Sequence, residues 1–202
     1  MEFSQIYRIS GFSVFGSWFI FAVVWIFLYI NHAKKRRKEH IRIRKREPKS
    51  MFGIILQAIA FFIIFSIHRD IGYSLQYPGI LFFMLTLLAI VIAPLSVIFA
   101  VYAVLTLGQQ WSFAARLIDN HKLITHGPYR LVRHPIYFTF FGLFVSTAFV
   151  ITPPAALLIA TILFIWGTVQ RIYTEEGLLL EHFGEEYLDY RDKVKMFIPF
   201  IY

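Results

Sequence analysis

The chain has 202 residues, of which 58% are hydrophobic and 19% aromatic, and it contains no cysteine. This composition lies outside the range of soluble globular domains and predicts an integral membrane protein. The absence of cysteine excludes disulfides, thiolate nucleophiles and cysteine-ligated metal centres. The formal net charge is +8, but the cations gather at the ends of apolar stretches, so the expected partner is the lipid bilayer with its headgroups and not nucleic acid.

Four apolar stretches approach or exceed the roughly 20 residues that a helix needs to cross about 30 Å of hydrocarbon. They cover residues 11–30, 51–67, 79–107 and 136–166. The first is expected to be a retained span and not a cleaved signal peptide, because no small-residue cleavage site follows it before the basic block.

Proline divides the later stretches. Residues 79–107 carry no charge and count as one span that Pro94 kinks, with two shorter spans as the alternative. The Pro153-Pro154 pair cannot continue a helix, so residues 136–166 are expected to form a hairpin of two short spans. The predicted fold is therefore an all-α membrane protein with about five transmembrane helices.

We treat residues 1–202 as a single domain, because neither an internal repeat nor a low-complexity linker divides the sequence. Residues 1–107 are expected to supply the N-terminal spans. Residues 108–202 are expected to hold the functional site.

Positive charge sets the expected orientation in the membrane. Residues 34–49 hold ten of the twenty Lys and Arg residues, so this loop is predicted to be cytoplasmic. Five spans then place the N-terminus, residues 68–78 and the Pro153-Pro154 turn outside. Residues 108–135 and the tail from Arg171 lie inside.

The polar residues of the second half form two clusters, which both fall on the predicted cytoplasmic face. The first, residues 121–137, reads HKLITHGPYRLVRHPIY, and the second contains Arg171 and the Glu175-Glu176 pair. We expect the clusters to fold together into one site, with one of the two carboxylates neutralising Arg133 near the hydrocarbon. Anchoring of helix ends alone does not need three His and two Tyr.

The tail is predicted to be an amphipathic helix that Gly184 interrupts, since leucines at 178–180 are set against several glutamates. Residues 197–201, FIPFI, are expected to return to the membrane interface.

Several common chemistries lack their sequence signatures. The three His of the first cluster are spaced by five and eight residues and no HExxH occurs, so no metal site is expected. Ser112 has no G-x-S-x-G context. The chain contains no G-x-G, which excludes a Rossmann-type nucleotide site, so any nucleotide-like cofactor must be bound in another way.

The string LITHGPYRLVRHPIY, then an apolar hairpin, then RIYTEEGLLLEHFGEEYLDY with the terminal FIPFI, resembles the isoprenylcysteine carboxyl methyltransferase family of membrane enzymes. Phospholipid N-methyltransferases are more distant relatives. The resemblance covers residues 107–202. It implies that S-adenosylmethionine is held outside the membrane, in a cytoplasmic pocket between the loop before the hairpin and the C-terminal tail, and that a lipophilic methyl acceptor enters from the bilayer.

By position, the resemblance assigns Arg171 to the acceptor, close to the methyl group. It assigns the cofactor to ten residues: His121, Lys122, Leu123, Ile124, Tyr129, His134, Pro135, Ile136, Tyr137 and Glu175. A sulfonium is a cation, which suits aromatic rings and a carboxylate, and a guanidinium suits an anionic acceptor. Thr139, Phe140 and Phe141 depart from the small residue of many relatives and predict a differently shaped lipid tunnel.

The predicted function is S-adenosylmethionine-dependent methyl transfer to a lipid or isoprenoid-like acceptor, through a carboxylate or a headgroup. Sterol reductases resemble the same half of the chain, so an NADPH-dependent membrane reductase is the alternative. A non-catalytic membrane lipid-binding protein is the third possibility. The sequence leaves the acceptor's identity and the oligomeric state open.

Overall fold

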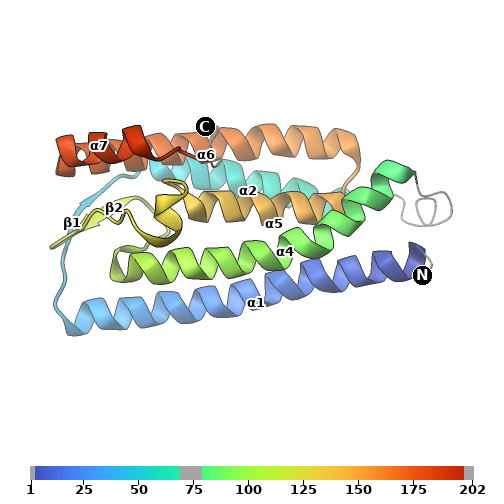
Figure 1. Cartoon of the computed structure of the whole chain (residues 1–202), viewed down its shortest axis with the longest axis horizontal. Coiled ribbons are helices and arrows are strands. Elements are labelled where there is room, and N and C mark those ends of the chain that lie inside the picture. Colours follow the sequence, from blue (N-terminus) through green and yellow to red (C-terminus); the bar gives the residue numbers. More distant parts are fainter. Residues whose placement is uncertain (1–2, 69–78, 198–202) are drawn as a thin grey trace.

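The computed structural model describes residues 3–68 and 79–197, which form an elongated helical bundle (Figure 1). Its helices are α1 (Phe3–Lys38), α2 (Ser50–Ser66), α4 (Ile80–Leu107), α5 (Pro135–Ile151), α6 (Pro154–Phe183) and α7 (Glu185–Lys193), with the short 3-10 helices η1 (Gly108–Gln110) and η2 (Gly127–Arg130). Strands β1 (Ile43–Arg46) and β2 (Arg116–Ile118) complete the described elements. The predicted helical character is confirmed, and the small sheet is an addition that the sequence reading lacks.

Three of the described helices, α1, α4 and α6, are long and apolar enough to cross a membrane, and α2 and α5 are shorter apolar helices of 17 residues each. Large apolar side chains face outward, among them Phe12, which is 82% exposed, and Phe19, which is 71% exposed. Such a surface is unfavourable in water, whereas lipid chains cover it. The chain is therefore a multi-pass membrane protein, and the count of five spans stays a prediction.

Pro94 and the Pro153-Pro154 pair have the effects on the helices that the sequence predicted. Helix α4 continues through Pro94 as one helix, and Figure 1 shows it changing direction along its length. Helix α5 ends at Ile151 and α6 begins at Pro154, which confirms the break between them. Pro fits this first helical position, since its missing N–H has no partner there in any helix.

The tail differs in one respect from the prediction. Helix α6 runs without a break from Pro154 to Phe183, so the second half of the predicted hairpin is a helix of 30 residues and not a short span. The second polar cluster lies in the C-terminal half of this helix. Gly184 then adopts a positive φ of 53° and separates α6 from α7, as predicted. Of the terminal residues expected at the membrane interface, Phe197 packs near Phe138 and Phe141, and 198–201 lie outside the described residues.

The basic linker after α1 is held by the two-stranded sheet, in which β1 pairs antiparallel with β2. The Asp119 carboxylate accepts hydrogen bonds from the backbone N–H of Arg42 at 3.1 Å and from Arg44 Nε at 2.8 Å. Residues 41–46 read IRIRKR, and this alternation of apolar and charged residues is a strand signal. The linker therefore has a structural role, which is to hold the loop after α4.

Helices α2 and α6 approach each other closely because two glycines face each other. A Cβ placed on Gly167 would lie 2.6 Å from the carbonyl oxygen of Gly53, so a side chain at this position would force the helices apart. One turn beyond Gly53, Gln57 is buried against α6. This close packing fixes the distance from α2 to the polar end of α6.

The polar parts of the chain gather at one end of the bundle. The end of α1, the sheet, the loop after α4 and α7 lie at the left in Figure 1, and the start of α1 and the α5–α6 turn lie at the right. Residues that the sequence places on one side of the membrane thus share one end of the molecule. The loop 68–78, predicted to face the other side, lies outside the described residues apart from its first position.

Candidate active site

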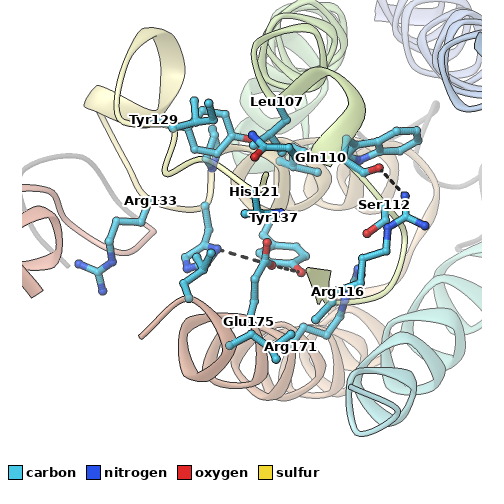
Figure 2. Close-up of a pocket in the computed structure, with 18 of the residues that line it drawn as sticks. Leu107, Gln110, Ser112, Arg116, His121, Tyr129, Arg133, Tyr137, Arg171 and Glu175 are labelled. Carbon is cyan, nitrogen blue, oxygen red and sulfur yellow. Dashed lines mark hydrogen bonds and ion pairs between the residues drawn. The ribbon is translucent and has the colours of Figure 1, made fainter. Parts of the chain in front are cut away.

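A cavity of about 1080 Å³, including its open mouth, lies at this polar end. The loop after α4, the start of α5 and the C-terminal half of α6 supply most of its walls, and Tyr190 of α7 and Trp25 of α1 also contribute. Figure 2 shows Glu175 and Arg171 on one wall, with Tyr129 across the cavity and Tyr137 between them.

All eleven residues that the sequence assigned to the site line this one cavity: His121, Lys122, Leu123, Ile124, Tyr129, His134, Pro135, Ile136, Tyr137, Arg171 and Glu175. They come from positions up to 54 residues apart in the chain, a separation taken from the numbering of His121 and Glu175. The structure therefore brings the two polar clusters together. Their individual roles are taken up below as proposals.

Glu176 is the carboxylate that neutralises Arg133. Its Oε1 lies 2.8 Å from Arg133 Nε and 3.0 Å from His134 Nε2, and the side chains of Arg133 and Glu176 are only 8% and 11% exposed. Arg133 Nη1 also donates to the carbonyls of Arg191 and Val194, and its guanidinium points away from the cavity in Figure 2. This buried pair joins the loop and α6 to the end of α7 and the residue that follows it.

Glu175 occupies a different environment, since its side chain is 37% exposed. Its Oε2 accepts a hydrogen bond of 2.9 Å from the Tyr137 hydroxyl and lies 4.0 Å from His134 Nδ1. The rings of His134 and Tyr137 stack with their centroids 5.6 Å apart. An accessible carboxylate beside two stacked rings is an environment that a ligand cation prefers.

Arg171 is held on three sides. Its Nη1 donates to Gln57 Oε1 at 2.6 Å, its Nη2 donates to the Phe113 carbonyl at 2.6 Å, and its guanidinium carbon lies 4.8 Å from the centroid of the Tyr137 ring. A guanidinium has five N–H donors, so these two bonds leave others for a ligand. The buried Nε is one of them, since no described residue accepts a hydrogen bond from it.

Gln57 is a site residue that the sequence reading missed. Its Nε2 donates to Thr168 Oγ1 at 2.8 Å, and that hydroxyl in turn donates to the Phe164 carbonyl. The Thr168 hydroxyl must therefore accept from Gln57, which leaves the amide oxygen facing Arg171. A single amide within the apolar stretch 51–67 was the available signal.

Five buried side-chain polar atoms on the cavity wall have no hydrogen-bond partner among the described residues. They are Trp25 Nε1, Arg116 Nε, His121 Nδ1, the Tyr129 hydroxyl and Arg171 Nε. Leaving a buried donor or acceptor unpaired costs roughly 1–3 kcal/mol. Several such groups around one cavity indicate a site that is completed by water or a polar ligand.

Burial keeps two of these groups neutral at neutral pH. Burial, with His182 and Arg116 nearby, lowers the pKa of His121 to about 4. Burial, followed by the negative charge of Glu175, raises the pKa of the Tyr129 hydroxyl well above its usual value. A neutral imidazole and a protonated phenol are suited to hydrogen bonding and not to charge pairing. Among the described residues, no group of three or more His, Asp or Glu side chains is placed to hold a metal ion.

An aromatic wall faces the polar residues. Trp25 of α1 lies with its ring 4.9 Å from Trp111 and 5.7 Å from Phe140, and all three line the cavity. Of the three residues expected to reshape a lipid tunnel, only Phe140 reaches the cavity. Thr139 is buried with its hydroxyl bonded to the Ile136 carbonyl, and Phe141 packs near Phe144 and Phe164.

The fold and the site define a class of protein: a multi-pass membrane protein with a mixed polar and aromatic cavity at one end of its helices. Within this class, the chain belongs to the isoprenylcysteine carboxyl methyltransferase (ICMT) family, whose model matches residues 81–181, half of the sequence. The matched segment begins in α4, earlier than the resemblance at 107–202, and ends before α7.

Curated relatives align over the same part. A probable protein-S-isoprenylcysteine O-methyltransferase of Oryza sativa subsp. indica is 40% identical over 101 residues, which are 49% of this chain and 53% of the relative. The protein-S-isoprenylcysteine O-methyltransferase of Tribolium castaneum is 35% identical over 101 residues, 49% of this chain and 36% of the relative. Protein-S-isoprenylcysteine O-methyltransferase A of Arabidopsis thaliana is 34% identical over 102 residues, 49% of this chain and 51% of the relative. The chain thus spans about half or less of the relatives it matches.

Proposed function

We propose that this protein transfers a methyl group from S-adenosylmethionine to the carboxylate of a lipid or isoprenoid-like acceptor, such as an S-isoprenylated cysteine. The observation that carries the proposal is the single cavity that combines an accessible carboxylate, stacked aromatic rings and a held guanidinium. The names of the aligned relatives support the same reaction class. Arg171 and the cofactor residues keep the roles that the sequence suggested.

The cavity residues fit a methyl-donor cofactor. When bound, S-adenosylmethionine supplies a methyl group on a positively charged sulfonium. Glu175, the Tyr137 ring and the ring of His134 would favour that charge, and the unpaired His121 Nδ1 and Tyr129 hydroxyl would bind its polar groups. Residues 121–124 form the neighbouring wall.

Arg171 would hold the acceptor. A carboxylate acceptor is ionised at neutral pH, since such a group has a pKa of roughly 3.5, so the chain need not supply a general base. The guanidinium matches a carboxylate by paired hydrogen bonds, and Gln57 and Phe113 keep it from rotating. The residues therefore act chiefly by positioning.

The direct test measures binding of the methyl donor. Glu175→Gln and His134→Ala are expected to weaken S-adenosylmethionine affinity by about tenfold to a hundredfold, because a charge-assisted hydrogen bond contributes roughly 1.5–3 kcal/mol. Calorimetry on the purified protein checks this. Unchanged affinity in both variants would contradict the assignment, and binding of NADPH in place of S-adenosylmethionine would favour a reductase.

We also propose that the cavity faces the cytoplasm and the N-terminus faces outside. The ten cations of residues 34–49 support this orientation, and the linker that holds them lies at the same end of the bundle as the cavity. Reporter fusions after Lys122 and after Glu185 should both report the cytoplasmic side. Reporters on opposite sides would contradict a site built from both segments.

Gln57 is proposed as a positioning residue for Arg171. Gln57→Leu removes the oxygen that accepts from Nη1, so we expect about a tenfold rise in the acceptor KM and little change in S-adenosylmethionine affinity. Steady-state kinetics with each substrate varied in turn would separate these effects. Ile59→Ala, on the exposed side of the same helix, is the matched control. An equal loss of donor affinity in Gln57→Leu would indicate general disruption of the site.

A further inference from the structure

Two arginines meet beside the cavity without a carboxylate between them. Arg36, in the last turn of α1, donates from Nη1 to the Gln109 carbonyl at 2.9 Å and to the Trp111 carbonyl at 3.4 Å. Arg116, in β2, donates from Nη2 to the same Trp111 carbonyl at 3.1 Å. None of the ion pairs found within residues 3–68 and 79–197 includes either arginine.

This arrangement is costly for the chain alone. Arg36 is only 8% exposed, and two cations that share one carbonyl oxygen repel each other. A buried charge without a partner destabilises a fold unless an anion compensates it. Burial, followed by the charge of Arg36, lowers the pKa of Arg116 to about 10, so Arg116 still carries its charge at neutral pH.

Arg116 belongs to the cavity wall, whereas Arg36 stands behind it. Arg116 shares the cavity with Glu175 and Arg171, and its buried Nε has no partner among the described residues. Figure 2 shows its side chain extending toward Ser112, on the far side of Arg171 from Glu175. Besides Arg171, the cavity thus offers a second guanidinium that pairs with no carboxylate, since the third, Arg133, is paired with Glu176. Lys122 is a further cation on the wall.

A purely structural role accounts for part of this geometry. The carbonyls of Gln109 and Trp111 follow the C-terminal end of α4, where cations are favourable. One arginine would satisfy that need. The second charge and the unpaired Nε on the cavity wall are left unexplained.

We propose that Arg116, with Arg36 behind it, forms a carboxylate-binding subsite of the cavity that is separate from Arg171. The inference rests on the proposed function. Since Arg171 is assigned to the acceptor, the remaining carboxylate is that of the amino-acid part of the methyl donor, and Glu175 is the matching anion for the donor's positive charges. The carboxylate of the acceptor is the other group that could bind at this subsite.

The test compares S-adenosylmethionine with decarboxylated S-adenosylmethionine, which lacks only this group. The wild-type protein in detergent should bind the intact donor about 10- to 100-fold more tightly by calorimetry. Arg116→Gln should lose most of that preference while binding the decarboxylated donor within a few fold of wild type. Arg37→Gln, an exposed position next to Arg36, is the control for charge alone and should keep the preference.

A second arm distinguishes the two sources of the carboxylate. The binding of an S-isoprenylcysteine is compared by calorimetry with that of its amide, which has the same shape but no carboxylate to bind or to methylate, in the same variants. If the wild-type protein prefers the acid over the amide and Arg116→Gln loses this preference, the subsite is supported and is assigned to the acceptor carboxylate.

Other outcomes overturn the inference. Equal weakening of charged and uncharged ligands in Arg116→Gln would show a structural role, and no change would show no role. If the wild-type protein prefers neither the donor nor the acceptor that carries a carboxylate, the subsite does not exist. This result needs no variant, so it holds even if a variant misfolds. A wild-type protein that binds no S-adenosylmethionine contradicts the proposed function itself, and the subsite with it.

Discussion

Arg171→Ala is expected to abolish methyl transfer and to leave S-adenosylmethionine affinity within a few fold of wild type. The guanidinium is held by Gln57 and the Phe113 carbonyl and still has N–H donors for an anionic acceptor. Two charge-assisted bonds to a carboxylate contribute roughly 1.5–3 kcal/mol each, so kcat/KM should fall by at least about a hundredfold. Parallel measurement of donor binding and of lipid methylation checks both parts.

A lysine at this position should restore little activity. Lysine keeps the positive charge but lacks the planar fork that contacts Gln57, Phe113 and a carboxylate together. The Arg171→Lys variant therefore separates bidentate binding from charge alone. A variant that loses donor binding and transfer together, or neither, would show that Arg171 supports the fold or snorkels to headgroups and does not bind the acceptor.

The sequence predicted those parts of the structure that depend on local chemistry. Hydrophobic length predicted the apolar helices, and the Pro153-Pro154 pair predicted the break between α5 and α6. The motif from residues 121–137, together with Arg171 and Glu175, predicted part of the cavity lining. In each case the signal lies within a few residues of the feature it predicts.

The parts that were missed depend on which helices are neighbours. Gln57 contacts Arg171, which is 114 positions away in the sequence, because two glycines let α2 approach α6. One sequence alone does not indicate that these two helices are neighbours. Trp25 reaches the cavity for the same kind of reason, since α1 packs beside α4 and α5. The half of the chain that looked like generic spans therefore contributes to the site through long-range packing.

The two adjacent carboxylates of α6 show how the surroundings of a side chain give two glutamates different roles. The sequence offered both Glu175 and Glu176 as partners for Arg133, and only their positions on the helix distinguish them. Glu176 points into a buried ion pair, while the side chain of Glu175 is more than a third exposed at the cavity. One carboxylate is thus suited to the fold and the other to a ligand.

Glu176→Gln is accordingly expected to be the most destabilising single change in this region. It leaves the guanidinium of Arg133, which is 8% exposed, without an anion and removes the charge beside His134. Removing one partner of a buried pair costs about 3–5 kcal/mol, and glutamine keeps one acceptor oxygen, so the free energy of unfolding is expected to fall by about 3 kcal/mol.

Glu175→Gln is the matched comparison, since it makes the same chemical change one residue earlier. Its exposed carboxylate should contribute little to stability, so this variant should unfold within about 1 kcal/mol of wild type and lose donor affinity instead. Denaturant unfolding in detergent micelles measures both. Equal destabilisation by the two variants would mean that burial does not separate their roles, and a stable Glu176→Gln protein would mean that the Arg191 and Val194 carbonyls alone suffice to hold Arg133.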